Sequence, residues 1–101
     1  MRFATYNTSL NRNNAGELLA ELRSGQSAQA ANVSAILQSI RPDVLVLNEF
    51  DYEPDNVAVK AFQDNFLGVS QGPGLEPLRW GGACEALASR TIVRLLASCL
   101  Y

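Results

Sequence analysis

The feature that most constrains this chain is a short apolar run that leads directly into acids. Residues 44–47 are Val, Leu, Val and Leu, with Pro42 before them and Glu49 shortly after them. Four residues are too few for a buried helix, and the β-branched valines favour a strand. Consecutive apolar residues predict that both faces of the strand are covered, as in a parallel sheet flanked by helices. Glu49 then lies at the carboxyl edge of a sheet, where α/β proteins bind ligands.

The composition limits the chain to one small domain and excludes several classes of function. The chain has 101 residues, 48% of them hydrophobic, and a formal net charge of −2. This acidic balance gives no general attraction to nucleic acid. The chain contains no His, which excludes His-based acid–base catalysis and His metal ligation within it. The two cysteines show neither metal-ligand spacing nor a disulfide framework.

The beginning of the chain predicts a strand followed by a helix. Residues 2–6 alternate and are rich in strand-forming residues, so we expect the first strand there. A helix is expected to begin near Asn14, because Asn14 and Glu17 form a pair that resembles a capping box. Gly25 suits the end of this helix.

A second helix is predicted before Pro42, with an apolar stripe that should pack on the sheet. Ser27 is its expected N-cap, and the residue before a proline is disfavoured in a helix, so the helix should end by Arg41. Apolar residues at i, i+3, i+4 and i+7 define the stripe. These residues are Val33, Ile36, Leu37 and Ile40.

The second half of the chain predicts a third helix and then a change of composition. Asp55 or Asn56 is the expected cap of the third helix, which fades at residues 67–68 after burying Val59, Phe62 and Phe66. Residues 72–82 are rich in Gly and Pro and are interpreted as a linker. Residues 83–101 have apolar residues at roughly helical spacing, so we expect an amphipathic tail.

Asn7 and Glu49 are expected to meet, although they are far apart in the sequence. Two strands joined by a crossover in one sheet are parallel, and their connection is right-handed in nearly all proteins. Asn7 ends the first strand and Glu49 the second, so neighbouring strands would bring them to about 5 Å from one another. Carboxylates bind Mg²⁺, and an amide can donate to a phosphate oxygen or accept from a metal-bound water. The pair has the chemistry of half a metal–phosphate site.

A second interpretation of the same residues stays open. Polar residues follow strands in most α/β proteins, so Asn7 can begin a turn and Glu49 a solvated loop. The acids at positions 49, 51, 53 and 55 suggest a calcium-binding loop. Neither register of that loop supplies the glycine and the final glutamate that the motif requires. We therefore expect a solvated acidic loop at this place.

Two segments carry a resemblance to a known family. Residues 2–7 read Arg-Phe-Ala-Thr-Tyr-Asn, and residues 41–49 read Arg-Pro-Asp-Val-Leu-Val-Leu-Asn-Glu. Together, in this order and with a helical region between them, they resemble the amino-terminal part of the endonuclease/exonuclease/phosphatase family, which has the deoxyribonuclease-I-like fold. In that family the first segment ends in Trp/Tyr-Asn and the second in Gln-Glu or Asn-Glu. The resemblance covers residues 1 to about 71.

The resemblance implies an α/β fold and an Mg²⁺-dependent activity. Residues 1–71 would form the β-α-α-β-α beginning of an α/β/β/α sandwich, which is incomplete in this chain. The family hydrolyses phosphoesters with Mg²⁺, and its substrates are nucleic acids or small phosphate esters. The resemblance implies Glu49 as the metal ligand and Asn7 as a catalytic residue that helps to form the metal and phosphate site. Ser9 stands where some members carry an Asp, so no second ligand is implied.

The later motifs of the family, a catalytic Asp/Asn pair and a terminal Asp-His, have no counterpart in this chain. We therefore interpret the chain as truncated or frameshifted, with residues 83–101 unrelated to the family, and expect it to be inactive alone. The long Asn-rich and Ala-rich insert, together with Asn-Glu-Phe-Asp at positions 48–51, is similar to a bacterial, often exported branch, although the sequence from Met1 predicts no secretory signal. Arg94 interrupts the longest apolar run near the end, so no membrane span is expected.

Two alternative functions remain open at this point. The first is a non-catalytic interaction fragment that self-associates through an uncovered sheet face, which the tail could also cover. The second is a nucleotide-binding βαβ module. This alternative requires a Gly-rich turn after the first strand, and residues 7–11 hold Asn, Thr, Ser, Leu and Asn instead.

Overall fold

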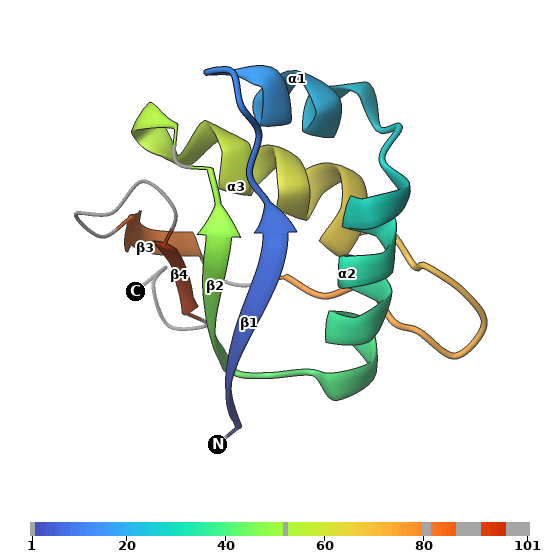
Figure 1. The fold of residues 1–101 in the computed structure, drawn as a ribbon. Coiled ribbons are helices and arrows are strands. Elements are labelled where there is room, and N and C mark those ends of the chain that lie inside the picture. Colours follow the sequence, from blue (N-terminus) through green and yellow to red (C-terminus); the bar gives the residue numbers. More distant parts are fainter. Residues whose placement is uncertain (1, 52, 80–81, 87–91, 97–101) are drawn as a thin grey trace.

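The computed structural model describes residues 2–51, 53–79, 82–86 and 92–96, which form a mixed α/β domain (Figure 1). Two parallel strands and three helices follow one another in the order β-α-α-β-α, which confirms the expected α/β arrangement. Two further strands complete the sheet. The elements are β1 (Phe3–Leu10), α1 (Glu17–Ser24), α2 (Ala28–Ile40), β2 (Val44–Phe50), a 3₁₀ turn η1 (Pro54–Asn56), α3 (Val57–Phe62), a π-helical turn η2 (Gln63–Leu67), β3 (Gly82–Ala86) and β4 (Ile92–Leu96).

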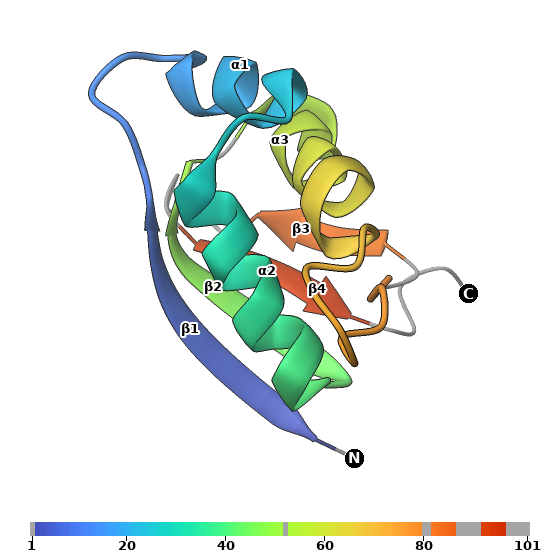
Figure 2. The same cartoon turned by 90° about the vertical axis from the view of Figure 1, so that its right-hand side faces the viewer.

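The sheet has the strand order β1-β2-β4-β3. β1 and β2 are parallel, and their register runs from Phe3 opposite Val44 to Asn7 opposite Asn48. β4 pairs with β2 and with β3 in antiparallel fashion. Figure 2 shows α2 and α3 on one face of this sheet. The parallel pair therefore brings the ends of β1 and β2 to the same edge.

The helices cover one face of β2, and its side chains divide accordingly. Leu45 and Leu47 are fully buried in the core, whereas Val44 and Val46 are half-buried on the opposite face. The expectation that both faces of this strand are covered is thus wrong within the described ranges. The neighbouring strands β1 and β4 flank the two valines and account for their partial burial.

The expected amphipathic helix over residues 83–101 is wrong wherever that segment is described. Residues 82–86 and 92–96 form β3 and β4, and β4 pairs with the whole of the apolar run in β2. The β-branched Ile92 and Val93 favour a strand over a helix. Pairing with β4 also supplies hydrogen-bond partners for the second side of β2, which a covering helix would leave unpaired. The rest of the tail, 87–91 and 97–101, lies outside the described residues.

The described part of the Gly/Pro segment, residues 72–79, packs against the domain. Leu78 is buried, and its N–H donates to the carbonyl of Leu67 at 2.8 Å. The guanidinium of Arg41 donates to the carbonyl oxygens of Glu76 at 3.0 Å and Pro77 at 3.3 Å. These bonds attach the segment to the C-terminal end of α2 and to η2.

The helix ends follow the predicted caps in α2 and depart from them in α1. Ser27 caps α2 by accepting from the N–H of Ala30, and Arg41 ends it in the left-handed conformation. Gly25 ends α1 as expected. The start of α1 lies later than predicted, at Glu17. Asn14 bonds to Glu17 with its side chain at 3.0 Å, but the N-cap position is Gly16.

The predicted apolar stripe of α2 is partly wrong. Val33 and Leu37 are buried, but Ile36 and Ile40 are 44% and 42% exposed. The buried face is rotated toward η2 and holds Ala30, Ser34 and Gln38 as well. The rotation follows from Gln38, whose amide bonds to the carbonyl groups of residues 67 and 69. In α3 and η2 the expected core residues Val59, Phe62 and Phe66 are all buried.

Within the described ranges, neither α2 nor any other helix combines the length and the apolar character needed to cross a bilayer.

Candidate functional site

Asn7 and Glu49 lie side by side at the carboxyl edge of the parallel pair β1–β2. The Asn7 side-chain amide donates from Nδ2 to Glu49 Oε2 at 2.6 Å, across 42 positions of sequence. Asn7 is exposed and Glu49 is half-buried. The expectation that these two side chains meet is confirmed. Glu49 is thus hydrogen-bonded rather than free in a solvated loop.

A bulge at the strand ends makes this contact possible. Between the pairs Asn7–Asn48 and Leu10–Phe50, β1 has two residues where β2 has only Glu49. Ser9 and Glu49 both adopt the left-handed conformation, with φ of 53° and 54°. Side chains alternate along a strand, so a regular β2 would direct Glu49 to the face of the buried leucines. The bulge redirects the carboxylate toward Asn7, as bulges near sites often do.

Thr8 holds the two strands together at the bulge. Its side chain is 3% exposed. Its hydroxyl lies 3.1 Å from the carbonyl oxygens of Asn48 and Glu49 and accepts from the N–H of Leu10 at 3.2 Å. These bonds replace ladder bonds that the bulge interrupts. A threonine hydroxyl can do this because it both donates and accepts.

Both ends of the Asn7 amide are occupied, which fixes the direction of the Glu49 carboxylate. Asn7 Oδ1 accepts from the N–H of Ser9 at 3.2 Å while Nδ2 donates to Glu49 Oε2. Glu49 Oε1 accepts no hydrogen bond from the part of the chain that the structure describes. Asn7 therefore orients Glu49 and leaves one carboxylate oxygen for a ligand.

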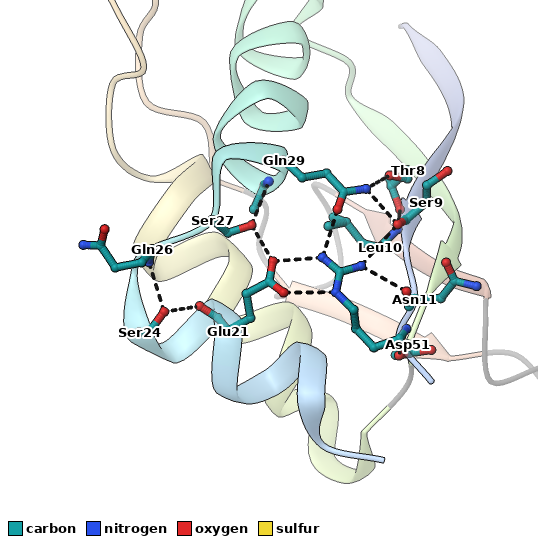
Figure 3. A network of polar contacts seen from close by, with 12 residues as sticks. Thr8, Ser9, Leu10, Asn11, Glu21, Ser24, Gln26, Ser27, Gln29 and Asp51 are labelled. Carbon is teal, nitrogen blue, oxygen red and sulfur yellow. Dashed lines mark hydrogen bonds and ion pairs between the residues drawn. The ribbon is translucent and has the colours of Figure 1, made fainter. Parts of the chain in front are cut away.

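A polar network lies next to the bulge, beside residues 8–10 of β1 (Figure 3). Its centre is the Arg12 guanidinium, which forms a two-point ion pair with Glu21: Nε to Oε1 at 3.0 Å and Nη2 to Oε2 at 2.9 Å. Nη2 also donates to Gln29 Oε1 at 2.9 Å. The Ser27 hydroxyl, at the start of α2, donates to Glu21 Oε2 at 2.6 Å. The network joins the loop after β1 to both α1 and α2.

The ion pair shifts the titration of both partners. The hydrogen bond from Arg12 lowers the pKa of the Glu21 carboxyl, with help from Ser27 and against the effect of partial burial. The hydrogen bond to Glu21 raises the pKa of Arg12, which stays charged at all relevant pH values. The two side chains are 17% and 27% exposed, so the pair is better shielded from water than a surface ion pair.

Asp51 is buried next to this network. It does not belong to a solvated acidic loop, which corrects the sequence-based expectation. It is 6% exposed, and Oδ2 accepts from the backbone N–H of Arg12 at 2.8 Å. Its own N–H donates to the carbonyl of Leu10 at 3.0 Å. Asp51 thereby ties the end of β2 to the chain that leaves β1.

The donor set at the bulge fits a weakly held Mg²⁺ ion. Mg²⁺ commonly binds one or two carboxylates and completes its shell with water and phosphate oxygens. Glu49 offers one oriented carboxylate with an available oxygen, at an open edge. Nowhere in the described ranges do three His, Cys, Asp or Glu side chains gather closely enough to form a metal cage. Glu49 would hold the ion, and Asn7 would orient Glu49 without ligating the metal itself.

A second surface feature lies elsewhere, over α1 and α3. It is an open depression of about 310 Å³, and its lining includes Arg23, Val57 and Asn65. Lys60, at the same place, pairs with Asp64 at 3.0 Å. Neither Asn7 nor Glu49 lines this depression, so it is separate from the strand edge.

Sequence reasoning identified Asn7 and Glu49 but missed the residues that position them. Thr8, Arg12 and Gln29 carry no motif, and each has at least one side-chain partner 17 or more positions away along the chain. The available signals were weak: a threonine at a strand end and an arginine in an Asn-rich loop. Comparison of the chain with models of known protein families, with curated proteins and with solved structures finds no match.

Proposed function

We propose that this chain carries the Mg²⁺- and phosphate-binding half-site of a phosphoester hydrolase of the endonuclease/exonuclease/phosphatase kind. The observation that supports this proposal is the 2.6 Å contact between Asn7 and Glu49 at the carboxyl ends of adjacent parallel strands. Ligands bind at this edge in α/β sheets. The two residues are also those that the sequence resemblance implies as site residues.

In this proposal the described residues bind and orient, and each has a defined role. Glu49 supplies one oxygen to Mg²⁺, whose chemistry when bound is to stabilise negative charge on phosphate oxygens. Asn7 keeps the carboxylate in one direction. A single carboxylate gives weak binding, with a dissociation constant on the order of millimolar. The chain has no His, and among the described residues none bonded to Asn7 or Glu49 serves as a general base, so we expect binding without turnover.

The binding step is tested by titrating the ¹⁵N-labelled chain with MgCl₂, with and without inorganic phosphate, and following backbone amide resonances. We expect saturable shifts at residues 7–9 and 48–50, and tighter binding of Mg²⁺ when phosphate is present. Glu49→Gln should abolish these shifts while the remaining spectrum stays folded. Glu53→Gln is the matched control, because it removes an acid of the neighbouring loop and should leave them intact. Equal loss in both variants would refute a site at Glu49.

The catalytic step is tested separately with a chromogenic phosphodiester and Mg²⁺. We expect hydrolysis at the background rate for the wild-type chain and for Glu49→Gln alike. Turnover that depends on Glu49 would contradict the expected inactivity and would indicate a more complete site.

A second candidate function, self-association through the uncovered sheet face, has one observation in its favour. Phe3, on that face of β1, is 69% exposed. Sedimentation velocity over a range of concentrations tests it, with Phe3→Lys as the disrupting variant. Val69→Lys is the control, because Val69 is 49% exposed but follows η2. A concentration-independent monomer, or equal behaviour of both variants, would exclude this candidate.

A further inference from the structure

We propose that Arg12 is a positioning residue for the Asn7–Glu49 half-site, although it touches neither side chain. This inference rests on the proposed function. It assigns to Arg12 the task of setting the direction of the Glu49 carboxylate through the backbone of Ser9 and the amide of Asn7.

Every N–H donor of the Arg12 guanidinium is used. An arginine side chain has five such donors. Three of them bond to Glu21 and Gln29 in the network described above. The two on Nη1 reach the carbonyl oxygens of Asn11 at 3.0 Å and Ser9 at 3.4 Å. The guanidinium is thus held from four sides and cannot rotate without breaking several bonds.

Arg12 and Gln29 together bind the carbonyl oxygen of Ser9. Gln29 Nε2 donates to the carbonyl oxygens of Ser9 at 2.8 Å and Thr8 at 3.2 Å. The Arg12 bond to Gln29 Oε1 fixes which end of the Gln29 amide faces these carbonyl groups. Ser9 is one of the two left-handed residues of the bulge, a conformation that an L-residue keeps only when its surroundings hold it.

Ser9 is in turn bonded to the half-site. Its N–H donates to Asn7 Oδ1, and this bond determines that Asn7 Nδ2 faces Glu49. If the bulge relaxes, the Ser9 N–H turns away, and the Asn7 amide loses the contact that sets its orientation. The carboxylate then loses its fixed direction. Three hydrogen bonds thus link Arg12 to Glu49: Arg12 bonds to Ser9, Ser9 to Asn7, and Asn7 to Glu49.

Lysine cannot take over this role. Its ammonium group has three donors at one point, whereas the acceptors around Arg12 belong to β1, the loop after it, α1 and α2, and each faces a different N–H of the guanidinium fork. An Arg12→Lys variant therefore keeps the charge beside Glu21 but loses the bonds that hold the bulge. Arg23→Lys is the matched control, since Arg23 is exposed near the end of α1 and takes no part in the network.

The test uses the Asn7 side-chain amide as a reporter that does not depend on metal. The two ¹H–¹⁵N resonances of this amide are assigned because they disappear in Asn7→Asp. The Glu49→Gln variant gives the positions of the Asn7 resonances when the acceptor is uncharged. We expect Arg12→Lys to move them toward the Glu49→Gln positions and to weaken Mg²⁺ binding by about tenfold, the usual effect of losing a residue that orients a ligand. Arg23→Lys should change neither quantity. Circular dichroism confirms that each variant is folded at the temperature of measurement.

A second variant keeps the test decisive if Arg12→Lys does not fold. Gln29→Leu removes the bonds of the Gln29 amide to the Ser9 and Thr8 carbonyl groups and to Arg12 Nη2, and leaves the ion pair of Arg12 with Glu21 in place. It should reproduce the shift of the Asn7 amide. Unchanged Asn7 resonances in a folded Arg12→Lys or Gln29→Leu protein would overturn the inference. If the wild-type chain binds no Mg²⁺ while the Asn7 resonances still respond to Arg12, the proposed function fails and the positioning role of Arg12 stands.

Discussion

Gln38 should be the most sensitive buried polar residue of α2, because it attaches the segment after η2 to the core. It is 2% exposed. Its Nε2 donates to the carbonyl oxygens of Leu67 at 2.9 Å and Val69 at 2.8 Å, and its Oε1 accepts from the N–H of Gln71 at 3.1 Å. Gln38→Leu keeps the approximate volume but removes all three bonds, although the carbonyl oxygens of Leu67 and Val69 each keep one other donor. At roughly 1 kcal/mol for each bond, the free energy of unfolding should fall by about 3 kcal/mol.

Ser34 provides a matched comparison one turn earlier on the same helix. It is fully buried, but its hydroxyl has no hydrogen-bond partner among the residues that the structure describes. Burying a hydroxyl without a partner costs about 1–3 kcal/mol, and alanine is the better helix former by about 0.5 kcal/mol. Part of this gain is offset by the small void left behind. Ser34→Ala should therefore raise the free energy of unfolding by about 1 kcal/mol.

Urea denaturation followed by circular dichroism at 222 nm measures both effects in one experiment. The two variants should move the unfolding midpoint in opposite directions with an unchanged slope. The heat-denaturation midpoint of Ser34→Ala should rise by about 4–8 °C. If Ser34→Ala destabilised the chain as much as Gln38→Leu, depth of burial alone would decide the cost, and the reasoning from hydrogen bonds would be refuted.

Two further predictions concern the turn after η2 and the acid response. Gly68→Ala should lower the free energy of unfolding by about 1–2 kcal/mol, because an added Cβ would lie 2.9 Å from the backbone carbonyl of Gln63. Replacing the nearby flexible Arg79 by Ala should not rescue it in a double-mutant cycle. Stability should fall as the pH drops below about 4.5 through the lowered pKa of Glu21, since its ionised form favours the folded state. Urea midpoints between pH 6 and pH 2 check this, and Glu21→Gln should show a flatter profile with a lower plateau at neutral pH.

The sequence was sufficient to predict the parts of the fold that depend on local patterns and on the order of elements. The parallel pairing of β1 with β2 follows from a strand, two helices and a strand, and it brings Asn7 and Glu49 to the same sheet edge. The bulge that turns the Glu49 carboxylate toward Asn7 was not predicted. The caps at Ser27 and Gly25 are local signals and were also correct. What these predictions share is that local sequence patterns and the order of the elements decide them.

The errors arose where distant partners decide the outcome. The buried face of α2 includes Gln38 instead of Ile36, because backbone groups 29 to 33 positions further along need its amide. Residues 92–96 are compatible with a helix or a strand by spacing alone, and they form β4 because β2 has a side available for pairing. Arg12 has partners between positions 9 and 29, and no local pattern identifies it.

The bulge shows why the site residues and the network behind them form one unit. The left-handed conformation costs an L-residue about 1–2 kcal/mol, so Ser9 and Glu49 together store a cost of about 2–4 kcal/mol. This is a considerable part of the 5–15 kcal/mol that keeps a typical domain folded. Glycine would form the same turn without steric strain, but glycine at position 49 would remove the carboxylate. Strain of this kind persists only where the surrounding structure holds it, and here Thr8 and the Arg12 network provide the bonds that do so. The energetic reason for a half-buried arginine that uses all five donors is therefore found at the strand edge, where Arg12 stabilises the conformation that brings Glu49 to Asn7.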